Sequence, residues 1–185
     1  MPPDTAAALP AVDDALLVAR ARAGERQALA VLVSRHLDEV YDVALRVLGD
    51  EELARDAAQD AFVNALRALH RFRGEASFRT WLLRIAVNAA RTLARRSIRR
   101  REVVLDAAAN MTAETDLAAG IVLPSQAARV AAALASLPEK QRLAVTLRVY
   151  QGLAYEEIGV IAGCSAGAAR VNYHLGIKRL RELLT

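Results

Sequence analysis

The chain has 185 residues, of which 54% are hydrophobic and 25% charged, and its formal net charge is +4 at pH 7. This hydrophobic fraction excludes a disordered chain, and no apolar run is long enough to cross a membrane. Its 40 alanines and 26 leucines favour helix, and β-branched runs bounded by turns are absent, so we expect an all-α protein.

Four helices are expected in the N-terminal half, after a tail of residues 1–12. Apolar residues recur there at three- and four-residue steps, which is the spacing of one buried helix face. The predicted helices span residues 13–23, 25–48, 51–71 and 78–100. Gly49 is suited to close the second helix, while Asp50 and Ser77 are suited to cap the third and fourth.

The C-terminal half repeats this helical pattern after an acidic segment of weak periodicity. Helices are expected over residues 126–137, 138–152, 154–162 and 166–184. We therefore predict two small helical domains, residues 13–100 and 127–185, joined by a flexible acidic linker over residues 101–126.

Cysteine and histidine are scarce. The single cysteine, Cys164, excludes an internal disulfide and is expected to be a small buried packing residue, with a redox-sensitive thiol as the alternative. Three scattered histidines give no metal-ligand spacing, so neither a metal ion nor a cofactor is expected. The first ten residues lack the basic cluster of a secretory signal, which predicts a cytoplasmic protein.

Charge is segregated along the chain. Residues 67–101 contain 11 arginines and one acidic residue, Glu75, whereas residues 14–66 carry a net charge of −4. Residues 102–127 contain four acids and no basic residue, and residues 128–185 carry a net charge of +4. A solvated helix face does not explain why acids are missing from the first block, so the pattern favours two modules that bind a polyanion.

The last two predicted helices form a helix-turn-helix. Gly163 supplies the positive φ of the tight turn, and Ser165 caps the longer second helix. That second helix is basic, and in a DNA-binding motif it would lie in the major groove. It would present Ser165, Ala166, Arg170, Asn172, Tyr173 and His174 to bases and phosphates, with Lys178 nearer the backbone. An ordinary helical hairpin is the alternative.

The basic helix over residues 78–100 suggests a second nucleic-acid contact. Arg84, Asn88, Arg91 and Arg95 recur at steps of three and four residues beside its apolar face. Such a stripe can follow a phosphate backbone; solvation or a membrane surface are the alternatives. Phe72, Arg73 and Phe78 lie around Gly74, where an unstacked base could be held. Trp81 is interpreted first as a core anchor.

The third helix carries an acidic face. Asp56, Gln59 and Asp60 fall on one side, with Phe62 at its edge. We interpret this side as a surface that docks a protein, with a solvated face as the alternative. Acid–base catalysis is disfavoured because no histidine, metal partner or cleft is evident near the two carboxylates.

Three motifs in this order resemble the extracytoplasmic-function (ECF) sigma factors, two-domain bacterial transcription initiation factors. "RDAAQDAFVNAL" resembles the family's core-polymerase-binding segment, and "FRGEASFRTWLLRIAVNAAR" resembles the segment that opens and reads the promoter near −10. "LPEKQRLAVTLRVYQGLAYEEIGVIAGCSAGAARVNYHLGIKRLREL" resembles the domain that reads the element near −35. Asp60 stands where the family usually has Glu, and Asn172 replaces a frequent Arg, which should alter base preference.

The resemblance implies a sigma factor that binds core RNA polymerase and directs promoter recognition, DNA melting and transcription initiation. It assigns polymerase binding to Asp56, Gln59, Asp60 and Phe62. It assigns contacts near −10 to Phe72, Arg73, Ser77, Phe78, Trp81, Arg84, Asn88, Arg91 and Arg95. It assigns contacts near −35 to Ser165, Ala166, Arg170, Asn172, Tyr173, His174 and Lys178. An anti-sigma factor is the further partner that it implies.

Other functions remain open from the residues alone. A stand-alone helix-turn-helix regulator would explain the C-terminal domain but leaves the basic block at residues 67–101 unexplained. A peripheral membrane protein would use the same basic helix, although the Arg and Asn stripe fits that role less well. An enzyme with a small-molecule substrate is not expected, because no nucleophile, base or metal set converges.

Overall fold

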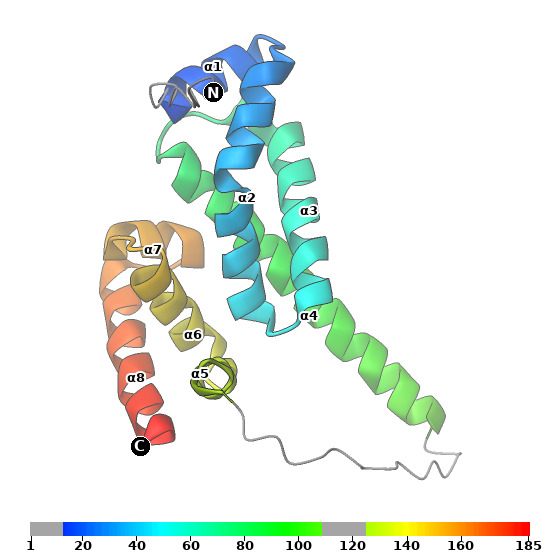
Figure 1. The fold of residues 1–185 in the computed structure, drawn as a ribbon, viewed down its shortest axis with the longest axis vertical. Helices are drawn as coiled ribbons and strands as arrows, with labels where there is room; N and C mark the ends of the chain where they lie inside the picture. Colours follow the sequence, from blue (N-terminus) through cyan, green and yellow to red (C-terminus); the bar gives the residue numbers. More distant parts are fainter. Residues whose placement is uncertain (1–12, 109–124) are drawn as a thin grey trace, which may run out of the picture.

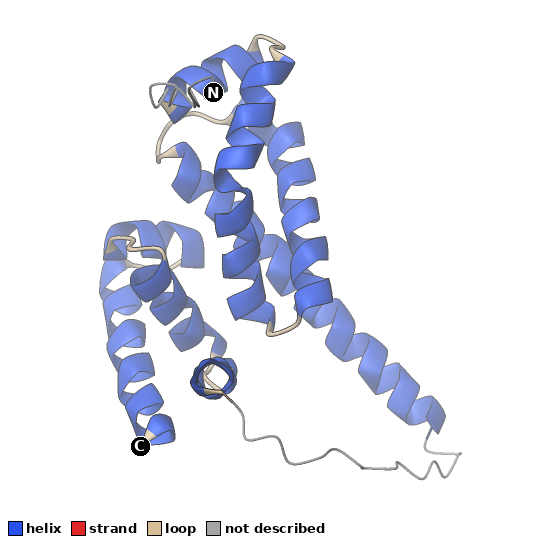
Figure 2. Cartoon of the chain, viewed as in Figure 1, coloured by secondary structure: helices blue, strands red, loops and turns tan. Residues whose placement is uncertain are grey.

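A computed structural model describes residues 13–108 and 125–185, and it describes side chains throughout these ranges except over 101–108. All regular elements within the described ranges are helical (Figure 2). The tail of residues 1–12 and residues 109–124 of the predicted linker lie outside the description. In the part of the chain that is described, no helix is both long and apolar enough to span a membrane.

The N-terminal domain consists of four helices and one short 3-10 turn. These are α1 (Asp14–Arg22), α2 (Arg26–Leu48), α3 (Glu51–Ala68), η1 (Leu69–Arg71) and α4 (Phe78–Ala108). The predicted caps of α2 and α3 are confirmed: Asp50 accepts a hydrogen bond from the first turn of α3, and Gly49 ends α2 at a φ of +70°. Asp13 caps α1 in the same way, by accepting from the Ala15 amide.

Alanine lets the three long helices of this domain pack closely. The face of α3 toward α2 and α4 is lined by small residues that are buried: Ala54, Ala57, Ala58, Ala61 and Ala65. Because methyl groups fill little space, the larger buried side chains of α2 and α4, such as Val40 and Leu82, fill the core between them.

The helix α4 is longer than predicted. It was expected to end near Arg100, but it continues to Ala108, so residues 101–108 of the predicted linker are helical. The segment lacks Gly and Pro, and nothing in its backbone chemistry ends a helix. In Figure 1 this end of α4 extends beyond α2 and α3.

The C-terminal domain contains α5 (Gln126–Ala135), α6 (Glu139–Val145), α7 (Tyr155–Ala162) and α8 (Ala166–Leu184), with a π-helical turn over Thr146–Tyr150 after α6. The predicted helix-turn-helix is confirmed, and Gly163 has a φ of +72° in its turn. A Cβ on Gly159 would lie 2.7 Å from the Cys164 carbonyl oxygen, so the turn needs a residue without a side chain there. Cys164 is exposed, and the prediction of a buried packing residue is wrong because all three residues of the tight turn, 163–165, are exposed to solvent.

The two domains contact each other along α4 and α7. Thr80 Oγ1 donates to Glu157 Oε1 over 3.0 Å, and Arg79 Nη2 donates to the Gln151 carbonyl over 2.8 Å. Apolar side chains continue the N-terminal core into the C-terminal domain; they include Leu143, Leu147, Leu153 and Ile158. Two further contacts, Arg91 with Glu139 and Arg46 over the Tyr150 ring, also join the domains. Figure 1 shows α5 to α8 lying beside α2 and α4.

Candidate nucleic-acid interface

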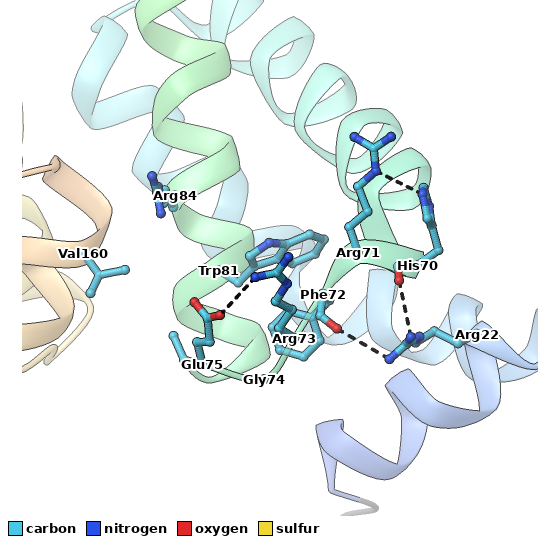
Figure 3. A pocket seen from close by; sticks show the side chains of 11 residues that line it. Arg22, His70, Arg71, Phe72, Arg73, Gly74, Glu75, Trp81, Arg84 and Val160 are labelled. Carbon is cyan, nitrogen blue, oxygen red and sulfur yellow. Dashed lines mark hydrogen bonds and ion pairs between the residues drawn. The ribbon is translucent and has the colours of Figure 1, made fainter.

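The turn between η1 and α4 opens onto a cavity of about 940 Å³ (Figure 3). Four arginines line it: Arg22, Arg71, Arg73 and Arg84. The rings of Phe72 and Trp81 form its aromatic wall, with their centroids 5.1 Å apart. A half-buried aromatic pair surrounded by cations offers stacking to a base and charge to its phosphates.

Phe78 lies behind this wall. Its side chain is in the core at 8% exposure, and its ring lies 5.7 Å from Trp81 and 6.0 Å from Phe72. The predicted contact of Phe78 with a base is therefore not favoured by its position, because little of the ring reaches the cavity. Ser77, also predicted to contact DNA, caps α4 by accepting from the Thr80 amide over 3.0 Å.

A buried polar network packs against the aromatic cluster of Phe72, Phe78 and Trp81 on the side of Phe78. The His36 ring lies 5.5 Å from Phe78, and its Nε2 is 2.7 Å from Asp14 Oδ2. Burial alone lowers the pKa of His36, but hydrogen bonds with Glu39 and Asp14 outweigh it and raise that pKa above its ordinary value. Arg79 Nε donates to Glu39 Oε1 over 2.7 Å, so the network continues into α4.

The polar stripe on α4 is exposed in most of its length. Arg84, Asn88 and Arg95 face solvent, as the helical spacing predicts. Arg91 differs, because its Nε donates to Glu139 Oε1 over 2.6 Å and its side chain is only 20% exposed. In this structure Arg91 is therefore engaged in the contact between the two domains.

The acidic side of α3 is also exposed. Asp56, Gln59 and Asp60 face solvent, and Phe62 is half-buried against the core. The sequence interpretation missed two exposed apolar residues on the same helix, Val63 and Leu66. Their spacing from Asp60 and Gln59 would have placed them beside the acidic face. The surface is therefore acidic with an apolar edge, which suits a protein partner better than a polyanion.

The second helix of the helix-turn-helix, α8, is called the recognition helix here. It exposes only some of the residues that were predicted to contact DNA. Arg170, His174 and Lys178 are exposed, and Ser165 Oγ caps the helix by accepting from the Ala168 amide over 3.1 Å. Asn172 is half-buried and donates to the Ala168 carbonyl over 2.8 Å.

Two tyrosines, Tyr155 and Tyr173, pack between α7 and α8. Tyr173 is half-buried, with its ring 5.9 Å from that of Tyr155, so it belongs largely to the packing of α8 on α7. Tyr155 was missed by the sequence interpretation. Its ring lies 5.0 Å from the Arg170 guanidinium and holds that side chain at the start of the exposed face.

The two candidate DNA surfaces adjoin each other. Val160 of α7 lines the aromatic cavity, and a second open cavity of about 550 Å³ lies between Arg84 and the start of α8. Ala166, the first residue of the recognition helix, lines this second cavity with Arg84. The polar stripe on α4 and the recognition helix α8 thus meet where the two domains are in contact.

Comparisons with known proteins agree with this division into domains. The family model described as Sigma-70 region 2 matches residues 32–101, and that of Sigma-70, region 4 matches residues 127–180. The chain is 36% identical over 166 residues to the RNA polymerase sigma-H factor of Pseudomonas aeruginosa, covering 85% of this chain and 86% of that protein. It is 33% identical over 180 residues to the ECF RNA polymerase sigma-E factor of Haemophilus influenzae, covering 92% and 93%.

Two solved structures have a similar fold. CnrH in complex with the cytosolic domain of CnrY is 30% identical, with a TM-score of 0.68 over 92% of this chain and 96% of that chain. The sigma factor RpoE in complex with the anti-sigma factor NepR, from Bartonella quintana, has a TM-score of 0.66 over 84% and 95%. At 22% identity this second likeness concerns the fold alone.

Proposed function

Since the chain belongs to the ECF sigma factors of the sigma-70 family, it directs promoter recognition by RNA polymerase, and we propose that three surfaces divide this work. The docking face is Asp56, Gln59, Asp60 and Phe62. The base pocket is the turn 72–77 with Trp81, extended by the α4 stripe of Arg84, Asn88, Arg91 and Arg95. The recognition face is the exposed side of α8 with Arg170, His174 and Lys178.

The docking face is proposed to bind core RNA polymerase. Its exposed carboxylates, Asp56 and Asp60, suit a basic surface, and Val63 and Leu66 add apolar area next to them. An acidic face repels the DNA backbone, so this side of the N-terminal domain points away from the promoter.

The base pocket is proposed to hold an unstacked base of the non-template strand. Unpairing costs a few kcal/mol, and stacking on an aromatic side chain returns about 1–3 kcal/mol per base. The single observation that carries this assignment is the Phe72–Trp81 pair inside a cavity lined by four arginines. Phosphate contacts of the α4 stripe would hold the strand on either side of that base.

The recognition face is proposed to read the element near −35 in the major groove. Arg170 can form paired hydrogen bonds with a guanine edge, and Lys178 lies two turns further along the same exposed side. Asn172 and Tyr173 contribute less in this proposal, because their side chains are engaged within the domain.

Promoter binding requires the two domains to separate. Elements centred near −10 and −35 are about 25 base pairs apart, which is about 85 Å along the duplex at about 3.4 Å per base pair. In this structure the base pocket and the recognition face adjoin across Arg84 and Ala166. We therefore assign the present arrangement to the protein before it engages a promoter.

A protein that holds this closed arrangement would inhibit the chain. RpoE of Bartonella quintana and CnrH were solved with the anti-sigma factor NepR and with the cytosolic domain of CnrY. By that likeness we propose an anti-sigma partner for this chain. Because this chain would act on RNA polymerase and promoter DNA, we propose that it acts in the cytoplasm.

Size-exclusion co-elution with bacterial core RNA polymerase tests the proposal. A stoichiometric complex that then binds promoter DNA, with little DNA binding by the chain alone, is the expected result. A folded chain that does not bind polymerase but binds duplex DNA would favour the stand-alone regulator instead.

A further inference from the structure

The last turn of α1 is joined to the turn that forms the base pocket. Arg22 Nη2 donates to the His70 carbonyl over 3.3 Å, and its Nη1 donates to the Phe72 carbonyl over 3.5 Å (Figure 3). Figure 3 shows the guanidinium lying across the chain just where η1 ends and the turn begins. This contact joins segments 48 and 50 residues apart in sequence.

The chemistry of this contact favours arginine. The last carbonyls of a helical turn carry partial negative charge and lack partners within the turn. A guanidinium presents several donors in a rigid plane, so one side chain can bridge two carbonyls, whereas an ammonium is a point charge. Arg22 therefore fixes the backbone on both sides of Arg71.

The turn beyond this contact is weakly held. Gly74 has a φ of +74°, and the neighbouring Arg73 and Glu75 side chains are 83% and 80% exposed with their charged atoms 3.8 Å apart. An ion pair so exposed adds little order. The path of the backbone before Gly74 consequently matters for where the Phe72 ring lies against Trp81.

The helix that carries Arg22 is itself firmly held. Leu17 and Val18 bury one side of α1, and Asp14 binds both Arg35 and His36 of α2. Because α1 is held in place by these contacts, Arg22 at its end can restrain the turn that it contacts.

We propose that Arg22 is a positioning residue of the base pocket: it sets the course of the turn and so holds the Phe72 ring against Trp81 for base stacking. This inference rests on the proposed function of the pocket. Arg22 also lines the cavity, so a direct phosphate contact is the rival role, and the two differ in what they do to the free protein and to the salt dependence of binding.

Trp81 gives a direct probe, because it is the only tryptophan of the chain. Its fluorescence emission and its quenching by acrylamide measure how accessible the indole is to solvent, in the full chain and without DNA. We expect Arg22→Ala, and Arg22→Gln as a milder second variant, to raise the quenching constant about twofold as Phe72 withdraws from the indole. Arg26→Ala removes the same charge from a nearby exposed position and should leave the quenching unchanged.

Binding of single-stranded DNA gives the second measurement. The probe is the fluorescein-labelled non-template strand of a promoter that wild-type holoenzyme enriches from a randomised library. With holoenzyme carrying Arg22→Ala we expect about tenfold weaker binding, an unchanged slope of log K against log salt, and no rescue by Arg22→Lys. Circular dichroism melting confirms that each variant is folded.

The outcomes separate the two ideas. Unchanged Trp81 quenching in folded Arg22→Ala, or a salt slope reduced by about one with rescue by lysine, would overturn the positioning role. Trp81→Ala is the control for the pocket itself. If Trp81→Ala binds the strand as tightly as wild type, the proposed base pocket fails, while the quenching experiment still decides whether Arg22 holds the turn.

Discussion

Removing the hydroxyl of Thr80 perturbs the contact between the two domains. This side chain is 1% exposed, and its Oγ1 donates to Glu157 Oε1 of α7 over 3.0 Å. Thr80→Val keeps the shape and removes the donor, while the Thr80 amide can still donate to Ser77 Oγ at the start of α4. The change also removes the 2.8 Å hydrogen bond between the Ser77 and Thr80 hydroxyls, so it acts on the start of α4 as well as on the contact between domains.

The expected shift follows from the charge of the acceptor. A hydrogen bond to a charged group contributes about 1.5–3 kcal/mol. Taking about 2 kcal/mol, with a tenfold change for each 1.4 kcal/mol, Thr80→Val should raise the ratio of open to closed molecules about 30-fold. Because the two DNA surfaces must separate to reach both promoter elements, promoter association should become faster in the same proportion wherever opening limits it.

Single-molecule energy transfer measures this ratio. Fluorophores at Ser34→Cys on α2 and Thr185→Cys after α8, in a Cys164→Ser background, report the separation of the domains. Thr92→Val is the matched control, because the Thr92 hydroxyl donates to the Asn88 carbonyl within α4. An unchanged distance distribution in Thr80→Val, beside an unchanged control, would refute the reasoning.

Four further predictions test other parts of the molecule. Asp60→Arg should abolish co-elution with core polymerase in a folded protein, and unchanged co-elution would contradict the docking face. Arg170→Ala should weaken binding of duplex −35 DNA by about 1–3 kcal/mol while sparing core binding, and equal loss of both would indicate misfolding. Because the folded pKa of His36 is raised, its stabilisation is complete below the unfolded pKa near 6.5 and is lost as pH rises through the folded pKa. Thermal melts of wild type should fall over that range and those of His36→Gln should not; parallel curves would refute the role of His36. Gly159→Ala, whose Cβ would lie 2.7 Å from a backbone oxygen of the turn, should cost about 1–3 kcal/mol of stability by urea unfolding. Gly167→Ala should not, because its Cβ would meet only Ser165 Oγ, at an ordinary contact distance of 3.9 Å.

Much of the fold could be predicted from the sequence because the signals are local. Asp50 and Ser165 cap their helices through atoms three residues away, and Gly163 turns the chain through its own φ. The end of α4 was the main error. It was placed at a change of composition near residue 101, yet a change in charge does not stop a helix that contains no Gly or Pro.

The candidate site was predicted less completely, because exposure depends on neighbours distant in the chain. Phe78 and Trp81 share the apolar face of α4, but Phe72 and His36 cover Phe78, whereas Trp81 is half-buried and lines the cavity. Tyr155 and Arg170 come together only when α7 crosses α8. Helical periodicity identifies a face, and it does not say which part of that face another helix will cover.

The sequence by itself therefore determined the helices, the helix-turn-helix, the segregation of charge and the family, since caps, periodicity and motifs act within a few turns of chain. Only the tertiary structure decided that Arg84 of α4 and Ala166 at the start of α8 line one open cavity, that Arg91 pairs with Glu139, and that Arg22 reaches the turn before the base pocket. The contacts of Arg91 and of Arg22 join residues about 50 positions apart. Their formation depends on how the packed cores orient whole helices, which no local pattern encodes.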